Sequence, residues 1–299
     1  MFMRSTYVSL LAGVFLLGSL AACQQKGIND DVTTKYDQND ADIQTYVAKN
    51  NLKGALLTSG LYFLRTDSVP GAKKPATGEE VEFTYKSYNL NTGTFVDSSS
   101  SASPVYYPFG INSILAGLEQ GLAMMGEGEK ATLLIPSYLG YNDRAIGTTL
   151  PAYSAVRFDV NLKKSRTEAQ QIDDYISRKK LTVTENAASG LRIIKTLANP
   201  AGQSALTGQT MVLKYKGKTL RAVTAFDSTG TGTFDAVVGQ GRFVPGFDEA
   251  LTKLKVGEKA TIIFPSALGY GSQGRISNNV YIISPYAPLL FELEAVSIK

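Results

Sequence analysis

The sequence repeats itself once, and the length of the repeat limits what the chain can fold into. The segment GEKAT at 128–132 recurs at 257–261. The same offset links a Pro, a Gly and a Tyr that follow each segment: Pro136, Gly140 and Tyr141 recur as Pro265, Gly269 and Tyr270. Solenoid repeats are about 20 to 45 residues long, and this period is far longer, so it indicates two whole domains. We place these domains at residues 40–164 and 167–299.

Each copy carries the same order of local patterns. Apolar residues at helical spacing predict a leading helix at 168–180. Apolar and polar residues alternate at 81–85 and at 156–162, which is typical of strands with one buried face. A second short amphipathic helix is predicted at 247–254. The predicted fold class is therefore α+β, with each domain an antiparallel sheet wrapped on one short helix and preceded by a leading helix.

The beginning of the chain resembles an export signal. Arg4 is followed by an apolar stretch at 7–22, which is shorter than the ~20 residues needed to span a bilayer. The stretch runs into Leu-Ala-Ala-Cys, which resembles the lipobox of bacterial lipoproteins, and Cys23 is the single cysteine of the chain. The resemblance implies that residues 1–22 are a removable signal peptide and that Cys23 is lipidated, with 23–39 as a polar tether. An ordinary signal peptide and an uncleaved anchor are the alternatives.

The composition excludes most conventional chemistry. The chain has no His and one Cys, so it lacks the residues for His-dependent nucleophile triads and for Cys/His zinc clusters. A net charge of +4, spread along the chain, argues against a nucleic-acid partner. The glycine-rich stretch at 239–241 lacks the rest of the G-x-G-x-x-G motif, which argues against nucleotide binding. We therefore expect no cofactor, and the missing His and the single Cys argue against a metal.

The second copy concentrates aromatic residues near Gly and Pro. Residues 212–272 are similar to the signature of the FKBP-type peptidyl-prolyl cis-trans isomerases, with Tyr in the first strand, Phe-Asp-Ser, a turn into the helix, and Gly-Glu-Lys-Ala followed by Pro and Tyr-Gly. The resemblance, carried over residue by residue, implies a pocket formed by Tyr215, Phe226, Asp227, Phe234, Phe243, Val244, Phe247, Tyr270, Ile283 and Phe291. After its Tyr, this copy carries an insertion relative to the first copy, which falls before Ile283.

The mechanism that this resemblance implies needs no cofactor. Rotation about an X-Pro bond faces a barrier of roughly 18 to 20 kcal/mol, which amide resonance sets. A dry aromatic pocket that disfavours the planar, charge-separated amide lowers this barrier without proton transfer. Four rings would form its walls and floor: Phe226, Phe234, Phe247 and Phe291. The Tyr270 hydroxyl and the Val244 N–H would bind substrate carbonyls, and Asp227 would orient the polar side.

The first copy resembles the same family but lacks three aromatic rings. Val96, Val105 and Leu118 stand where the family has Phe, Phe and Trp. Seven other positions align with the pattern: Tyr85, Asp97, Ile114, Leu115, Tyr141, Leu150 and Phe158. Aliphatic side chains in place of rings would widen and flatten the site, so we expect the first domain to bind chains weakly or only to carry the second.

We predict an isomerase that assists the folding of exported, proline-containing polypeptides, with the second domain as the catalyst. The lipid would anchor it in the cell envelope, at the outer membrane and facing the periplasm. A non-catalytic peptide-binding or chaperone lipoprotein with FKBP-like folds is the alternative, since one fold hosts several functions. A transporter-associated or adhesin lipoprotein without a peptide site is a third class.

Overall fold

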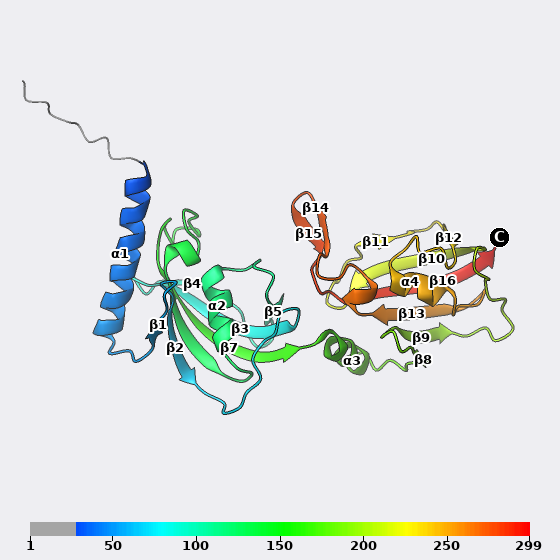
Figure 1. Ribbon diagram of the computed structural model, residues 1–299, viewed down its shortest axis with the longest axis horizontal. Helices are drawn as coiled ribbons and strands as arrows, with labels where there is room; N and C mark the ends of the chain where they lie inside the picture. The colour runs from blue at the N-terminus through cyan, green and yellow to red at the C-terminus, as the bar shows by residue number, and fades with distance from the viewer. Residues whose placement is uncertain (1–27) are drawn as a thin grey trace, which may run out of the picture.

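A computed structural model describes residues 28–299, which form two domains that follow one another along the long axis of the molecule (Figure 1). The elements of the first domain are α1 (Ile28–Lys49), β1 (Ala55–Leu56), β2 (Tyr62–Asp67), β3 (Glu80–Asn89), β4 (Phe95–Ser98), β5 (Val105–Pro108), α2 (Ala116–Met124), β6 (Lys130–Ile135), the 3-10 turn η1 (Ser137–Leu139) and β7 (Val156–Arg166). The elements of the second domain are α3 (Glu168–Arg178), β8 (Glu185–Asn186), β9 (Arg192–Leu197), β10 (Thr210–Thr219), β11 (Asp227–Ser228), β12 (Phe234–Val237), α4 (Pro245–Leu251), β13 (Lys259–Phe264), η2 (Ser266–Leu268), β14 (Arg275–Ser277), β15 (Val280–Ile283) and β16 (Leu289–Ile298).

The two main sheets share one topology, as the sequence repeat predicts. In the first domain the strand order is β1-β2-β6-β7-β3-β4, with β5 also paired to β3. In the second domain the order is β8-β9-β13-β16-β10-β11, with β12 also paired to β10. Neighbouring strands in both sheets run antiparallel. The predicted α+β fold class is confirmed.

A leading helix packs against the outside of each sheet in an equivalent way. In the first domain, Asn39 of α1 accepts a hydrogen bond from the Ser137 backbone N–H at 2.6 Å. In the second domain, Glu168 of α3 accepts from the Ser266 N–H at 2.5 Å and from its hydroxyl at 2.7 Å. The sequence separation is 98 for both pairs, so the helices are part of the duplicated unit.

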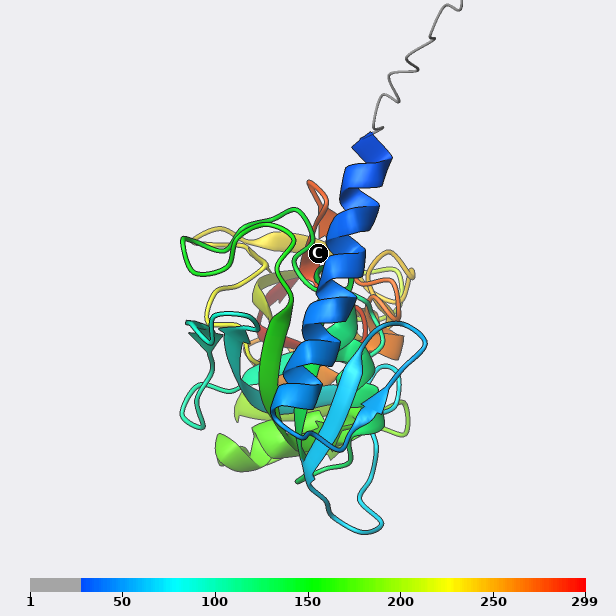
Figure 2. The same ribbon diagram turned by 90° about the vertical axis from the view of Figure 1, so that its left-hand side faces the viewer.

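The first of these helices begins earlier than the sequence indicates. The polar stretch ahead of residue 40 shows no apolar period, yet α1 begins at Ile28 and lies along the first domain (Figure 2). Tertiary contacts compensate for the missing period, since the Tyr36 hydroxyl donates to Asn142 at 2.8 Å and its ring lies 5.1 Å from that of Tyr138. The predicted polar tether over 23–39 is therefore helical from residue 28 onward. Cys23 and the predicted signal peptide lie outside the described residues.

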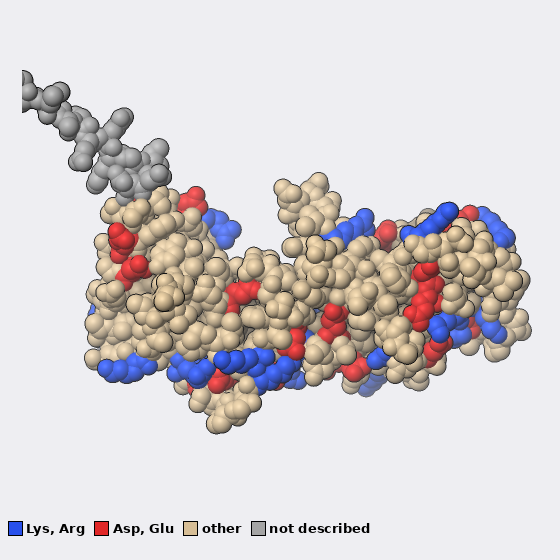
Figure 3. Space-filling model, in the orientation of Figure 1, with Lys and Arg blue, Asp and Glu red and all other residues tan. Residues whose placement is uncertain are grey.

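Charges of both signs are interspersed along both domains on the face shown in Figure 3. Within residues 28–299, no helix is long and apolar enough to cross a membrane.

The repeated Gly-Glu-Lys segment, which leads into β6 and β13, makes similar hydrogen bonds in the two domains. Gly257 has a φ of +85°, a conformation that favours glycine, and it donates its N–H to Ala295 at 2.7 Å. The buried Glu258 side chain then accepts from Lys195 at 2.9 Å and from the Lys255 N–H at 2.9 Å. In the first domain, Glu129 likewise accepts from an arginine and from backbone N–H groups. The segment recurs because its residues have conformational or hydrogen-bonding roles.

We expect Glu258→Gln to lower the free energy of unfolding by about 1 to 3 kcal/mol, because it leaves Lys195 without its charged partner. Burial raises the pKa of Glu258, but the hydrogen bonds from Lys195 and from backbone N–H groups outweigh burial and hold the pKa below its ordinary value of 4.5. The stabilisation is therefore fully present above pH 4.5 and is lost as the pH falls through the lower folded-state pKa.

Urea unfolding at pH 7 and at pH 3 measures this difference. The gap between the unmodified chain and Glu258→Gln should narrow at the lower pH. Glu292→Gln is the matched control, because its carboxylate pairs with Lys218 while 51% exposed and should matter by less than about 1 kcal/mol. An equal gap at both pH values would contradict the assigned role.

Candidate active site

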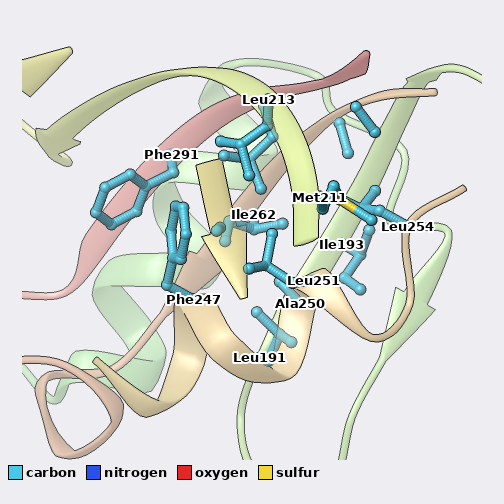
Figure 4. Packing of buried hydrophobic residues seen from close by; sticks show 14 of the residues in the cluster. Leu191, Ile193, Met211, Leu213, Phe247, Ala250, Leu251, Leu254, Ile262 and Phe291 are labelled. Atoms are coloured by element: carbon cyan, nitrogen blue, oxygen red, sulfur yellow. The ribbon is translucent and has the colours of Figure 1, made fainter. Parts of the chain in front are cut away.

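The buried core of the second domain ends at an open aromatic pocket. Helix α4 lays Phe247, Ala250 and Leu251 on the sheet, and Phe247 and Phe291 lie side by side at one end of this cluster (Figure 4). The helix comes close because Gly246 has no side chain, since a Cβ there would lie 2.5 Å from the ring of Phe264. The pocket beyond these two rings has a volume of about 570 Å³.

Ten residues line this pocket, and six separate segments contribute them. They are Tyr215, Phe226, Asp227, Phe234, Arg242, Phe243, Val244, Phe247, Tyr270 and Phe291. Nine of the ten are residues that the sequence prediction named. The first and the last of them lie on β10 and β16, which are distant in the chain but neighbours in the sheet, so the antiparallel topology brings the set together.

The rings form one connected cluster with edge-to-face geometry. Phe247 lies 5.1 Å from Phe291 and 5.5 Å from Phe243, with interplanar angles of 69° and 61°. Phe226 meets Phe291 at 5.7 Å and 86°, and Phe234 meets Tyr215 at 5.6 Å and 79°. Aromatic pairs favour such arrangements, which hold each ring in a defined orientation. The result is a preformed hollow with aromatic walls.

A glycine in the middle of a strand makes room for two of these rings. Gly217 of β10 lies opposite Phe291 of β16, and a Cβ at this position would lie 2.6 Å from the Phe291 ring. The same Cβ would lie 2.8 Å from the ring of Phe226. Glycine weakens a strand interior and marks a close approach, which here is that of the two pocket walls.

The polar side of the pocket is built on Tyr215 and Asp227. The Tyr215 hydroxyl donates to Asp227 Oδ2 at 2.9 Å. Burial, together with this carboxylate, raises the pKa of Tyr215 to about 12, so the hydroxyl stays protonated at neutral pH. The hydrogen bond orients Asp227 at the mouth of the pocket.

Two other donors in the pocket have no acceptor among residues 28–299. One is the hydroxyl of Tyr270, which follows η2. The other is the N–H of Val244, the N-cap residue of α4, whose carbonyl already accepts from the N–H groups of Phe247 and Asp248. Both donors are therefore available to carbonyl groups of a bound chain.

Comparison with known proteins places this arrangement in a family. A model of the FKBP-type peptidyl-prolyl cis-trans isomerase family matches residues 71–163 and 202–296, one region in each domain. The chain belongs to the FKBP family. The aromatic pocket thus lies within the second of two FKBP domains.

Relatives from several organisms agree with this assignment. The chain is 31% identical over 227 residues to the mouse protein "Peptidyl-prolyl cis-trans isomerase FKBP9", a match that covers 74% of this chain and 36% of that protein. It is 36% identical over 97 residues to yeast "Peptidyl-prolyl cis-trans isomerase FPR2", covering 32% of this chain and 72% of the relative. The chain thus spans about a third of the length of FKBP9.

A solved structure of several FKBP domains is also similar to the chain. The structure of the three FKBP domains of wheat FKBP73 matches with a TM-score of 0.37 and 21% identity, covering 81% of this chain and 96% of that one.

One predicted FKBP pocket residue lies elsewhere. Ile283 is 1% exposed at the end of β15, where it belongs to the same buried core cluster as Phe247 and Phe291 and does not line the pocket. The insertion after Tyr270 forms the hairpin β14–β15, in which Arg275 pairs with Ile283 through an irregular register. Because the Ile283 side chain is buried in this core, its assignment to the pocket is wrong.

Arg242 was not predicted from the sequence. This exposed residue lines the pocket directly before Phe243, and its guanidinium has no carboxylate partner among the described residues. No family motif includes Arg242. The position of such a side chain at the pocket rim depends on the course of the loop and not on core packing. Its place immediately ahead of the Phe-Val pair was the one available signal.

The first FKBP domain keeps the polar pair of the site but not its walls. The Tyr85 hydroxyl donates to Asp97 at 2.6 Å, as Tyr215 does to Asp227. The other aligned residues lie in or against the core of the first domain: Val96, Val105, Ile114, Leu115, Leu118, Tyr141, Leu150 and Phe158.

A compensating change accompanies the loss of one wall. Ser87 stands where the second domain has Gly217, paired with Phe158 across the strands and buried. In the second domain a Cβ at this position would lie 2.8 Å from the ring of Phe226, so Ser87 is accommodated more easily beside the smaller Val96. The two pockets thus differ at a pair of neighbouring positions, Ser87 and Val96 in the first domain and Gly217 and Phe226 in the second.

Proposed function

We propose that the second domain catalyses cis–trans isomerisation of X-Pro bonds in polypeptides. The observation that carries this proposal is the aromatic pocket of about 570 Å³, whose walls meet edge to face and which holds two unpartnered donors within the described part of the chain. Its chemistry needs neither a nucleophile nor a proton donor, in agreement with a chain that has no His. Membership of the isomerase family supports the same activity.

The pocket would act by desolvation and shape. The pyrrolidine ring of the substrate would lie among Phe226, Phe247 and Phe291, away from water. In such surroundings the planar amide loses the solvation of its charge-separated resonance form, so the twisted transition state is favoured relative to it. The Tyr270 hydroxyl and the Val244 N–H would hold carbonyls on either side of the proline and fix its orientation.

The alternative function is that of a non-catalytic module that binds exposed apolar segments. The remodelled pocket of the first domain favours this role for that domain alone. The second domain retains every ring of the family pattern, with Phe247 where Trp is common. We therefore assign catalysis to the second domain and a carrying or weak binding role to the first.

A protease-coupled isomerisation assay on the whole chain, with a short X-Pro peptide, tests the activity. Uncatalysed exchange takes tens to hundreds of seconds, so acceleration is read directly. A chain that binds the peptide and leaves its exchange at the uncatalysed rate would support the binding module instead.

We also propose that the protein is anchored by lipid at Cys23 in the bacterial cell envelope, at the outer membrane and facing the periplasm, where it would assist the folding of exported proteins. The lipobox-like Leu-Ala-Ala-Cys and the placement of the single cysteine support this. Cys23 lies outside the described residues.

We expect Cys23→Ala to move the protein from the membrane fraction to a soluble or unprocessed form, because acylation at this residue would be its anchor. Fractionation of cells, with immunodetection of both forms, measures the shift. Ala22→Gly, which keeps the cysteine and a small residue before it, should leave the distribution unchanged. Processed, membrane-bound Cys23→Ala protein would contradict the lipid anchor.

A further inference from the structure

A loop that carries a pocket wall is held by the other domain. The loop between β10 and β11 ends at Phe226, and shortly before it Arg221 reaches into the first domain. Its Nε and Nη2 each donate to one oxygen of Glu80 in β3, both at 2.6 Å. A bidentate pair of this kind fixes both distance and orientation.

The Arg221 contact is partly shielded from water. Its guanidinium carbon lies 3.3 Å from the centre of the Tyr106 ring of the first domain, and the Glu80 side chain is only 12% exposed. Burial lowers the pKa of Arg221, but the Glu80 carboxylate outweighs burial and raises it above the ordinary value. Beyond Arg221 the loop faces solvent at Val223, which is 92% exposed. The arginine is therefore the contact that positions this loop from outside its own domain.

Glu80 is itself held in place. Arg166, at the end of β7, is 11% exposed and lies 3.6 Å from Glu80, while it binds Glu82 at 2.5 Å and Asp174 of α3 at 2.6 Å. Arg166 thus ties the sheet of the first domain to the leading helix of the second. The acceptor that Arg221 uses is part of a fixed junction.

A second pocket segment touches the first domain nearby. Tyr286 lies in the loop before β16, and its ring packs on Gly78, where a Cβ would lie 2.9 Å away. Its N–H donates to the carbonyl of Gly271, next to the pocket residue Tyr270. The first domain thus contacts the two segments that lead to Phe226 and to Phe291.

The first domain holds the equivalent loop by another partner. Asn91, the counterpart of Arg221 in the first copy, donates to Asp42 of the leading helix α1 at 2.6 Å. In the second domain the counterpart of Asp42 is Gln171, whose side chain instead donates to the Arg166 carbonyl. Leu220 still packs against the cluster that holds Ile172 of α3, as Leu90 does with Ile43 of α1. The polar contact of the loop, however, is made to the neighbouring domain instead of to the leading helix.

We propose that the first domain positions the catalytic pocket of the second. Arg221 is the positioning residue, and Glu80 and Tyr106 are the first-domain residues that bind it. The inference rests on the proposed isomerase function. This role of the first domain does not depend on its own pocket, which lacks three of the aromatic rings. When the contacts of Arg221 with Glu80 and Tyr106 are lost, the loop samples conformations in which Phe226 no longer lines the pocket. Only the fraction of molecules with Phe226 in the pocket wall then binds substrate.

Variants in the first domain of the full chain test this, because they lie outside the pocket. We expect Tyr106→Leu and Glu80→Gln to raise the KM for an X-Pro peptide about fivefold with kcat nearly unchanged, at the low end of measured couplings between sites. Tyr106→Phe keeps the ring and should match the unmodified chain. Lys299→Gln is the control for charge loss, because Lys299 pairs with Asp235 within the second domain at 2.7 Å.

Hydrogen exchange gives a readout that does not depend on catalysis. The Phe226 N–H donates to Gly217 at 2.9 Å, so it reports whether the loop is closed. We expect its exchange to be about fivefold faster in Tyr106→Leu and unchanged in Tyr106→Phe and Lys299→Gln.

The outcomes separate the inference from the function. If Tyr106→Leu and Glu80→Gln leave both KM and the Phe226 exchange rate unchanged, the positioning role is wrong even where the chain is active. If the unmodified chain does not isomerise, the proposed function fails, and the exchange rates alone decide whether the first domain orders the pocket. A loss shared by Lys299→Gln would point to general charge effects and overturn the assignment.

Discussion

Phe226→Ala in the full chain should lower kcat/KM for X-Pro isomerisation by about thirtyfold. Burying a Phe side chain contributes about 1.5 to 3 kcal/mol, and each 1.36 kcal/mol of transition-state stabilisation is tenfold in rate. Phe226 is only half buried. Its ring lines the pocket and contacts Phe291, with the ring centres 5.7 Å apart. The substitution removes a wall of the hollow more than it removes core.

Val96→Ala is the matched control for this variant. Val96 occupies the place of Phe226 in the first domain and packs against the core of that domain. We expect no change in the rate from Val96→Ala, because the proposed function assigns catalysis to the second pocket alone. Thermal unfolding of both variants must show cooperative transitions before the rates are compared. A fully active Phe226→Ala chain, or equal losses from both substitutions, would place the catalyst elsewhere.

The sequence repeat was sufficient to predict two domains of similar fold. The segment Gly-Glu-Lys-Ala-Thr marks the same strand in each domain, and its residues have fixed roles: Gly257 adopts a positive φ, and Glu258 closes a loop from a buried position. Such positions tolerate few residue types, so they persist in both copies. The pocket was predictable for the same reason, since Phe247 and Phe291 are both core and wall.

Other features depend on tertiary contacts that no local pattern reveals. The helix α1 extends back to Ile28 along a polar stretch, because its side chains bind partners such as Asn142 far away in the chain. Ile283 was misplaced because an insertion breaks the register with the family, and the direction of its side chain depends on how the hairpin rejoins the sheet. The pair between Arg221 and Glu80 joins two domains across a long stretch of chain, so the sequence carries no local sign of it.

We expect the two halves of the chain to differ sharply in activity. Residues 167–299 contain the leading helix, the complete sheet and every lining residue of the aromatic pocket, so this piece should fold alone and accelerate X-Pro exchange. Its rate should fall short of the full chain by about fivefold, because it lacks Glu80 and Tyr106. Residues 24–164 should fold as well, yet should show little or no acceleration, because aliphatic side chains have replaced three of the rings.

The most direct test of catalysis by the second domain is therefore the isomerisation rate of each half, measured side by side on one X-Pro peptide after each piece has been shown to melt cooperatively. We expect clear acceleration by residues 167–299 and a rate near the uncatalysed one for residues 24–164. Equal rates from the two halves, or a folded second half that binds the peptide and leaves its exchange uncatalysed, would contradict catalysis by the second domain.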